Sequence, residues 1–279
     1  MIERRYPMKK YLALILVLVL TASLFAGCAA PKKTALIATP SPHAEILELI
    51  KDDMKAKGFD LEITVVTDYV TENPAVAGGD AIANFFQHVP YLAGYNETAS
   101  DKEKLVGVVP THFEPLAIYK GTKDTLEAAA DGDKVAIPND PTNMTRALLL
   151  LQDAGLITLP EGTTLDSIVT KEDIVDNVYS LEIIEANAEQ IPGLRADVAY
   201  AVINGNNAAL ANLNPSVDGI FAEPADSQAA AAYVNLFAVK PENENSDFVK
   251  ALQECVYTQK VYDLIVERGF VPTFTPASK

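Results

Sequence analysis

Arg146 is the polar residue of this sequence whose position best suits ligand binding, because it falls in the first turns of an apolar helical segment at 143–154. A guanidinium in that place can hold a carboxylate through two parallel hydrogen bonds. The start of the helix adds N–H groups and the positive end of its dipole. The alternative is a solvated arginine that counters Asp140 or Asp153. The chemistry favoured by this residue is the binding of a carboxylate.

Two asparagines near the ends of expected strands could complete such a site. Asn204 follows the expected strand at 198–203, and Asn235 lies inside the one at 234–239. An amide offers both donors and an acceptor, so the two could serve a carboxylate and an ammonium. Asparagines in turns are usually backbone caps, and that default role is expected of four others: Asn206, Asn207, Asn212 and Asn214.

A cluster of aromatic residues lies where another strand ends. Residues 84–91 contain three aromatic rings and an imidazole, and such side chains can form the wall of a pocket for an apolar group. A thioether would gain further from sulfur–aromatic contacts, worth about 0.3–1.5 kcal/mol each. Because neighbouring strand residues face opposite sides, one of Phe85 and Phe86 belongs to the core, and Phe86 is predicted for the pocket. The other candidates are His88, Tyr91 and, after the preceding strand, Tyr69, which could equally be a surface tyrosine.

The supply of reactive residues argues against an enzyme. The sequence contains no nucleophile elbow, Ser-x-x-Lys, His-Glu-x-x-His, phosphate-binding loop or dinucleotide-binding glycine motif. Cys255 has no histidine nearby in sequence and is interpreted as a small core residue of a helix. His43, His88 and His112 are isolated, so no metal or cofactor is predicted, although the three could converge in space, as in zinc-binding receptors.

The first 28 residues have the pattern of a lipoprotein export signal. Basic residues precede an apolar stretch from Tyr11 to about Ala26, which is short for a membrane span of roughly 20 residues. The segment Leu24-Phe25-Ala26-Gly27-Cys28 is similar to a lipobox, in which the cysteine thiol takes a diacylglycerol. The prediction is a signal peptide at 1–27 and a lipid anchor on Cys28, at the outer face of the cell membrane. An uncleaved anchor helix is the alternative.

The charge of the chain excludes several partners. The 279 residues carry a net charge of −16, and removal of 1–27, which carries +3, would leave −19. Such an acidic surface argues against nucleic acid and against electrostatic binding to anionic lipid headgroups. With Cys28 acylated, Cys255 has no cysteine partner, so a disulfide framework is excluded.

Short apolar strands alternate with amphipathic helices along the rest of the chain, a pattern typical of an α/β protein with mainly parallel sheets. The helix at 143–154 is the clearest, because residues 139–142 supply capping groups and Gly155 ends it. Strands are expected at 34–38, 61–66, 81–85, 105–109, 116–119, 135–137, 181–185, 198–203 and 234–239.

A run of strand–helix units this long usually divides into two sheets, with a ligand held between them at the carboxyl ends of the strands. The expected fold is therefore α/β and two-lobed, with two mixed, mainly parallel sheets and flanking helices, as in an extracytoplasmic solute receptor. Crossings between the lobes are expected near 110–119 and 233–239. Residues 28–33 would form a lipidated linker, 34–112 with 236–279 the first lobe, and 113–235 the second lobe.

Four segments carry a resemblance to a known family. Their sequences are SPHAEIL at 41–47, ANFFQHVPYL at 83–92, AIPNDPTNMTRALLLL at 136–151 and AVIN at 201–204. In this order they look like the NlpA-type family of methionine-binding lipoproteins. The likeness spans about 34–275, and several long motifs in register are more specific than any one of them.

The resemblance implies a receptor of the type II periplasmic-binding-protein fold that delivers methionine to an ABC importer, which consists of a membrane permease and an ATPase. Family members hold the methionine side chain among aromatics and a histidine, which map onto Tyr69, Phe86, His88 and Tyr91. They hold its backbone with an arginine and two asparagines, which map onto Arg146, Asn204 and Asn235. His112 is a further ligand candidate, at a place where members vary.

Two departures from the family pattern fall near the inferred pocket. Asn207 stands where an aromatic residue is common, and Gln228 with the alanines at 229–232 replaces the usual Pro-Tyr approach to Tyr233. Another amino acid or a methionine-containing dipeptide therefore stays open as the ligand. Two hypotheses from other classes also stay open: a surface protein that binds a host or cell-wall macromolecule, and a metal receptor that uses the three histidines.

Overall fold

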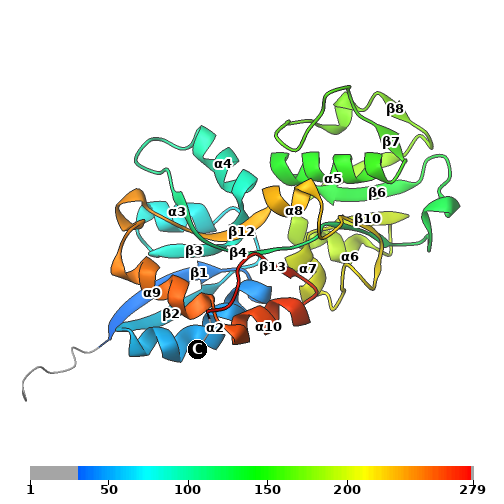
Figure 1. The fold of residues 1–279 in the computed structure, drawn as a ribbon. Coiled ribbons are helices and arrows are strands. Elements are labelled where there is room, and N and C mark those ends of the chain that lie inside the picture. Colours follow the sequence, from blue (N-terminus) through cyan, green and yellow to red (C-terminus); the bar gives the residue numbers. More distant parts are fainter. Residues whose placement is uncertain (1–30, 278–279) are drawn as a thin grey trace, which may run out of the picture.

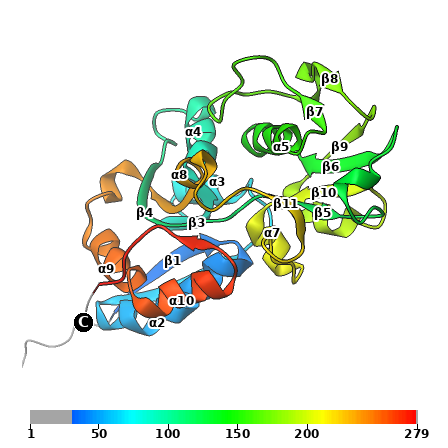
Figure 2. The same cartoon turned by 45° about the vertical axis from the view of Figure 1, so that its right-hand side comes forward.

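The computed structural model describes residues 31–277, which form two lobes, each built around its own sheet (Figure 1). The lobes remain distinct when the molecule is turned (Figure 2). The expected signal peptide at 1–27 and the lipidation site Cys28 lie outside the described residues. None of the helices described has the length and apolar content needed to cross a membrane.

The first lobe contains a six-stranded sheet between two layers of helices. Side chains of its central strands alternate between the two faces, since successive strand residues point to opposite sides. Leu36 packs in one core with Ile46 and Leu252, whereas Ile37 packs in another with Val76. In order across the sheet, the strands are β13 (Val271–Pro272), β4 (Val106–Phe113), β12 (Val234–Val239), β3 (Ala83–His88), β1 (Lys32–Ala38) and β2 (Phe59–Val65). The helices are α2 (Glu45–Ala56), α9 (Asp247–Val256) and α10 (Gln259–Glu267) on one face, and α3 (Glu72–Gly78) and α4 (Val89–Thr98) on the other (Figure 1).

The second lobe repeats this plan with a five-stranded sheet. Val135 and Ile137 pack in a core with residues of the helix at Pro141–Asp153, and Ala136 between them faces the opposite core. In order across the sheet, the strands are β11 (Gly219–Ala222), β5 (Ala117–Lys120), β10 (Tyr200–Ile203), β6 (Lys134–Pro138) and β9 (Glu182–Ala186). Its helices are α5 (Pro141–Asp153) on one face, and α6 (Ile191–Leu194) and α7 (Gly205–Leu210) on the other.

The remaining elements connect these layers. The chain passes from the first sheet to the second between β4 and β5, and it returns between β11 and β12. Connecting elements are the ribbon of β7 (Ile157–Thr158) and β8 (Asp176–Asn177), α8 (Gln228–Ala232), and helical turns at Pro40–Ala44, Leu126–Ala128, Lys171–Asp173, Ala188–Gln190 and Pro241–Asn243.

Each of the strands expected from the sequence overlaps a strand of the structure. The strands that the sequence did not predict are β7, β8, β11 and β13, which are too short for a period of two to show. The helix expected at 143–154 is α5, and its expected capping is confirmed. The carboxylate of Asp140 accepts the N–H of Asn143 at 3.0 Å, Pro141 takes the first helical position, and Gly155 follows the end with φ at +73°.

The sheets are mixed, as expected, but the expectation that they are mainly parallel is wrong. Parallel pairing is limited to β1 with β2 and β3, and to β6 with β9 and β10. The other pairs of the two large sheets are antiparallel. The strands next to the crossings cause this difference. They carry the chain into the other lobe or back from it, and so they run antiparallel to the strands of the strand–helix units.

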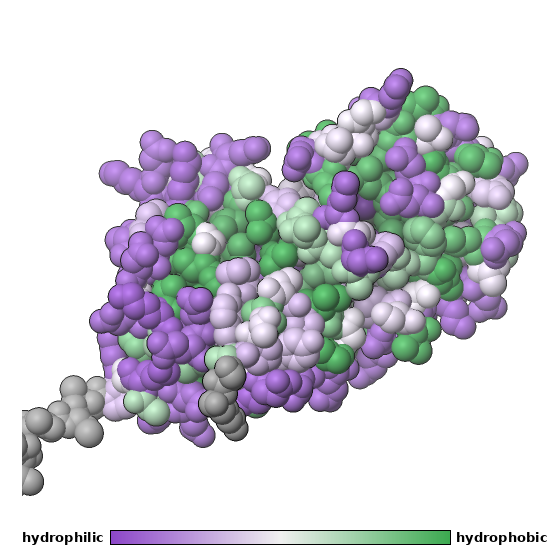
Figure 3. All heavy atoms as spheres, viewed as in Figure 1, coloured by the Kyte–Doolittle hydropathy of each residue, from purple (hydrophilic) through white to green (hydrophobic). Residues whose placement is uncertain are grey.

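Much of the charge of the chain lies on outer helix faces. Figure 3 shows hydrophilic residues gathered over α2 and α10, along the bottom of the first lobe. Oppositely charged side chains pair there, with Lys260 2.5 Å from Asp53 and Lys51 3.1 Å from Glu48. Exposed pairs of this kind stabilise a fold by only about 0–1 kcal/mol, so these helices are held by their apolar faces.

Glu72, at the start of α3, is a buried carboxyl group without a partner. Its residue is 0% exposed, and neither carboxyl oxygen has a hydrogen-bond partner among the described residues. Burial raises the pKa of this carboxyl well above its usual range, and the charge of Asp68 raises the pKa further. The fold therefore favours the protonated form of Glu72.

Replacement of Glu72 by glutamine should stabilise the protein, relative to the parent, increasingly as the pH rises. A carboxyl whose pKa is higher in the folded chain contributes stability that is complete below its unfolded pKa and is lost as the pH rises through the folded pKa. Glu72→Gln has no such loss. The difference in the free energy of unfolding between variant and parent should therefore grow by about 1.4 kcal/mol per pH unit between the unfolded and the folded pKa of Glu72. Urea unfolding of both proteins from about pH 5 to about pH 8 measures it. A difference that stays constant with pH would contradict a protonated Glu72.

Candidate functional site

A cleft lies between the two sheets, beside the segments that connect them. Groups from both lobes line it: Tyr69, Phe86, Gln87, His88, Tyr91, Glu114, Asn143, Arg146, Asn204, Gly205, Asn206 and Asn235. The cleft therefore has the place expected of a ligand site in a two-lobed receptor.

The structure brings together every side chain predicted for ligand binding except His112. His112 lies on β4, is 0% exposed, and stacks on Phe270 with the ring centres 5.9 Å apart. Its ring also lies near His43 and Phe85, inside the first lobe. Its Nε2 meets the carboxylate of Glu114, which does line the cleft, so His112 lies behind a lining residue and is not itself one.

Arg146 is buried, so the alternative of a solvated arginine is wrong. Its guanidinium pairs with Glu223, with Nε 2.8 Å from Oε1 and Nη2 2.5 Å from Oε2, and the whole residue is only 3% exposed. Nη2 also donates to the backbone carbonyl of Glu114 at 2.8 Å. The guanidinium lies over the ring of Tyr233, 4.2 Å from its centre. No hydrogen bond to a described residue engages Nη1, which leaves that nitrogen as the donor for the cleft.

Glu223 keeps Arg146 charged in spite of burial. Removal from water disfavours a cation, but the attraction and hydrogen bonds of the Glu223 carboxylate outweigh that effect and hold the pKa of Arg146 above its usual value. No local sequence pattern indicates this pairing, because the two residues are 77 positions apart. Asp140, one of the expected counter-charges, caps α5 instead.

Aromatic rings form one wall of the cleft. Phe86 lies 5.5 Å from Tyr91 and 5.8 Å from Tyr69, measured between ring centres, and the rings are tilted or edge-on. Phe85 points the other way, is 0% exposed, and stacks on Phe237 at 3.9 Å. The predicted division between a cleft-lining Phe86 and a core Phe85 is confirmed.

Tyr69 also joins the two lobes. Its hydroxyl donates to Oδ1 of Asn206 at 2.6 Å and accepts from Nδ2 of Asn207 at 2.8 Å, so a residue that follows β2 is bonded to α7. The default role of turn cap is therefore wrong for these two asparagines, whose amides reach across the cleft. Asn212 and Asn214 do lie in turns: Asn212 has φ at 58°, and Oδ1 of Asn214 accepts a backbone N–H two residues on.

A chain of hydrogen bonds fixes the polar side chains at the other end of the cleft. Oδ1 of Asn143 accepts from Nδ2 of Asn204 at 2.8 Å and from Nε2 of His88 at 3.1 Å. Nδ1 of His88 accepts the N–H of Tyr91 at 3.2 Å, so this histidine is neutral with its proton on Nε2. Burial, aided by Arg146, lowers the pKa of His88 to about 3. These bonds leave Oδ1 of Asn204 buried without a hydrogen-bond partner among the described residues.

The sequence did not identify Asn143 or Glu114 as cleft residues. Asn143 lies one turn before Arg146 on the same helix, so helical spacing could have placed both on one face. Glu114 directly follows β4 in the connection to the second lobe, but only the folded chain shows that its side chain is buried at 5% exposure.

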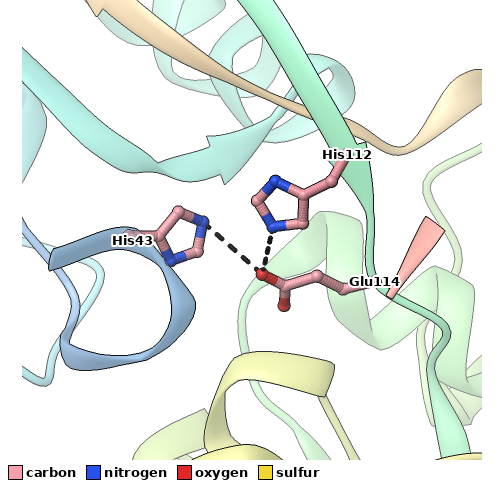
Figure 4. Close-up of side chains that lie close together, drawn as sticks. All are labelled: His43, His112 and Glu114. Carbon is pink, nitrogen blue, oxygen red and sulfur yellow. Dashed lines mark hydrogen bonds and ion pairs between the residues drawn. The ribbon is translucent and has the colours of Figure 1, made fainter. Parts of the chain in front are cut away.

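The three histidines do not converge. His88 lines the cleft, whereas His43 and His112 meet Glu114 below it (Figure 4). Nε2 of His112 lies 2.9 Å from Oε1 of Glu114, and Nε2 of His43 lies 3.5 Å from the same oxygen. The shorter separation is that of a hydrogen bond, so these are hydrogen-bonded side chains and not the predicted alternative of a three-histidine metal site. Burial lowers the pKa of His43 to about 4 and that of His112 to about 3, and it raises the pKa of Glu114.

Replacement of Glu223 by glutamine should lower the free energy of unfolding by about 3–5 kcal/mol, because it leaves the buried charge of Arg146 without its counter-charge. Glutamine keeps an oxygen for the N–H of Leu116, which Glu223 accepts at 2.8 Å. The matched control is Glu62→Gln, which removes an exposed pair with Lys33 and should cost less than about 1 kcal/mol. Denaturant unfolding measures the loss of unfolding free energy for each variant. Equal losses would show that the buried pair stabilises the fold no more than the exposed pair does.

Comparisons with known proteins agree with this geometry. A family model described as NlpA lipoprotein matches residues 36–277. The D-methionine-binding lipoprotein MetQ of Salmonella typhi is 40% identical over 223 residues, which cover 78% of this chain and 79% of that protein. Among solved structures, a lipoprotein of Ruminococcus gnavus has a TM-score of 0.81 at 42% identity, over 86% of this chain and 99% of the other. A nutrient binding protein of Burkholderia cenocepacia, bound to methionine, has a TM-score of 0.80 at 34% identity, over 86% of this chain and 100% of the other. The chain belongs to the NlpA lipoprotein family.

Proposed function

We propose that this protein is an extracytoplasmic receptor, and not an enzyme, that binds methionine between its lobes and delivers it to an ABC importer. The observation that carries the proposal is that the cleft is lined both by polar groups, among them Arg146 and Asn204, and by a cluster of aromatic rings, at Tyr69, Phe86 and Tyr91. An α-amino acid with an apolar side chain offers a match for both kinds of group. Two relatives support this ligand, since one is a D-methionine-binding lipoprotein and one was solved with methionine bound.

The carboxylate of the ligand would bind between Arg146 and Asn235. Nε and Nη2 of Arg146 are committed to protein acceptors, so Nη1 is the edge that remains. Oδ1 of Asn235 takes a hydrogen bond from Nε2 of His43 at 3.1 Å, which leaves the NH₂ group of this amide for the cleft. Because Glu223 offsets the charge of Arg146, binding would depend on directed, charge-assisted hydrogen bonds more than on a free positive charge.

The ammonium of the ligand would bind at Asn204. Its Oδ1 is buried and has no hydrogen-bond partner among the described residues, while its Nδ2 is held by Asn143. An unsatisfied buried acceptor costs about 1–3 kcal/mol. A ligand N–H would remove that cost, so the empty acceptor favours a ligand that carries a donor at this point.

The side chain of the ligand would lie against Tyr69, Phe86 and Tyr91. A thioether gains about 0.3–1.5 kcal/mol from each sulfur–aromatic contact, in addition to the burial of its apolar surface.

Binding would be coupled to closure of the lobes. The hydroxyl of Tyr69 bonds Asn206 and Asn207 across the cleft, so an aromatic residue of the site can keep its place only when the lobes are together. A ligand that contacts both lobes stabilises the closed state by its differential affinity for it.

The lipid on Cys28 would tether the receptor to the outer face of the cell membrane. Membership of a lipoprotein family supports this anchor. β1 begins at Lys32, so the expected linker is two residues shorter than predicted, and residues 28–31 would form it. This linker would keep the receptor within reach of the permease and its ATPase, which raises the effective concentration of the receptor at the transporter.

Isothermal titration with L-methionine, D-methionine and glycyl-methionine tests the ligand, on protein that has been freed of bound molecules by unfolding and refolding. At least one methionine enantiomer should bind, and the dipeptide should bind more weakly because a peptide N–H replaces the ammonium that faces Asn204. The paired variant Arg146→Met with Glu223→Leu removes both buried charges at similar volume. It should weaken binding by about 2–5 kcal/mol, since the ligand carboxylate loses its partner.

The matched control is Lys33→Met with Glu62→Leu, which removes an exposed ion pair outside the cleft and should leave the affinity unchanged. Absence of heat with all three ligands, at concentrations well above micromolar, would rule out methionine recognition. Unchanged affinity in the paired Arg146 variant would show that the carboxylate binds elsewhere.

Substitution of Cys28 by serine should abolish lipidation, because serine lacks the thiol that takes the diacylglycerol. In cells fed labelled palmitate, the parent protein should carry label and sediment with membranes, whereas Cys28→Ser should carry none. An unlabelled parent protein that retains its first 27 residues would instead support an uncleaved anchor helix.

A further inference from the structure

Glu114 is the acidic residue among those that line the cleft, and its carboxylate contacts both lobes. Oε1 faces His112 and His43 in the first lobe, and Oε2 accepts the N–H of Asn206 in the second lobe at 2.7 Å (Figure 4). A carboxylate has about four lone-pair sites, so these bonds do not exhaust its capacity to accept. Its side chain also lies against Gly205, the residue after Asn204, which places it beside the proposed ammonium site.

The hydrogen bonds around His112 require a proton between it and Glu114. The hydroxyl of Thr111 donates to the carbonyl of Asn235 at 3.0 Å, so its oxygen must accept from Nδ1 of His112 at 2.8 Å. With its proton on Nδ1, a neutral His112 has a lone pair on Nε2. That lone pair faces Oε1 of Glu114 at 2.9 Å, and two acceptors cannot share such a contact without a proton.

The surroundings favour this proton on the carboxyl group. The titratable or charged groups that face Glu114 are His43, His112, Arg146 and Tyr69. Burial disfavours the charged forms of both histidines and of the carboxylate, and Arg146 is already paired with Glu223. Nε2 of His43 donates to Asn235, so this ring supplies no further proton to Glu114.

We propose that Glu114 is a third recognition residue, which accepts a hydrogen bond from the ammonium of the ligand and gives up the proton that it shares with His112. The inference rests on the proposed function, because it assigns a role at the same site. An ammonium carries three donors, of which Asn204 can accept one. Glu114 accepts another from the opposite wall, and a cation in contact with a carboxyl group favours its ionised form.

The proton balance closes without any other reactant. One proton passes from the Glu114–His112 contact to solvent when the ligand binds. His112 then keeps one proton, on Nε2, and donates it to the Glu114 carboxylate, while the hydroxyl of Thr111 turns from Asn235 to donate to Nδ1. The ammonium of the ligand would contact Glu114 directly, whereas the carboxylate of the ligand would be held by Arg146 and Asn235, so the attraction would exceed the repulsion.

Proton release is measured by titrating L-methionine into the parent protein in several buffers that differ in ionisation enthalpy. The observed heat should vary with the buffer, and the slope should report a fraction of a proton released for each ligand bound. The affinity should weaken as the pH falls from about 8 to about 6, by at most about tenfold per unit for one proton. L-methionine keeps its ammonium and carboxylate charged over this range, so the protons come from the protein.

Glu114→Gln keeps the folded geometry while it removes the titration. Its amide can donate to Nε2 of His112 and accept from Asn206, as the protonated carboxyl group does. This variant should release no proton and should bind L-methionine about 10- to 100-fold more weakly, as expected for one hydrogen bond to a charged group. It should bind 4-(methylthio)butanoate, which is methionine without its amine, within about threefold of the parent protein. Glu72→Gln, which removes a buried carboxyl outside the cleft, should leave the proton count unchanged.

The outcomes separate the two proposals. If L-methionine gives no heat with the parent protein, the proposed function itself fails. If it binds without releasing a proton, or if Glu114→Gln weakens the amine-free analogue as much as methionine, the proposed function stands and the role of Glu114 is overturned. The number of protons that the parent protein releases on binding L-methionine tests the role of Glu114 even if Glu114→Gln does not fold.

Discussion

The buried charge of Arg146 is the constraint on which the cleft depends. A guanidinium that is 3% exposed cannot remain unpaired, because removing a lone charge from water costs more than a fold can supply. Glu223 meets this requirement from the end of β11, and the same carboxylate accepts the N–H of Leu116 just before β5. One ion pair thus holds α5, the first crossing and the edge of the second sheet together, at a point where α5 and the crossing border the cleft.

The bonds that join the lobes are also bonds of the cleft. Tyr69 reaches α7 through Asn206 and Asn207, and Glu114 links two histidines of the first lobe to the backbone of Asn206. Each of these contacts breaks if the lobes separate. Under the proposed function, recognition and closure would share the same hydrogen bonds, so a ligand that strengthens them would shift the balance between open and closed lobes without any separate switch.

Local patterns in the sequence were sufficient to predict which side of a strand or helix a residue faces, but not which distant elements contact one another. Strand alternation separated Phe86 from Phe85, and an arginine on an apolar helix pointed to Arg146, because both depend on neighbours a few residues away. The partner of Arg146 is 77 residues distant, and nothing in the local pattern around Glu223 specifies it. His112 was misplaced for the same reason, since the ring on which it stacks, Phe270, comes from the far end of the chain. The short strands escaped because two to four residues show no period.

The hydrogen bonds that each cleft amide makes to the protein determine which of its groups is left for the cleft. Asn235 gives its oxygen to His43 and keeps its NH₂ group for the cleft, whereas Asn204 gives its NH₂ group to Asn143 and keeps its oxygen. One amide is thereby fixed as a donor and the other as an acceptor, although the two side chains are chemically identical. A ligand must place its acceptor near Asn235 and Arg146 and its donor near Asn204, as an α-amino acid does in one orientation only. His43, behind the cleft, and Asn143, in its wall, would thus determine which way round such a ligand binds.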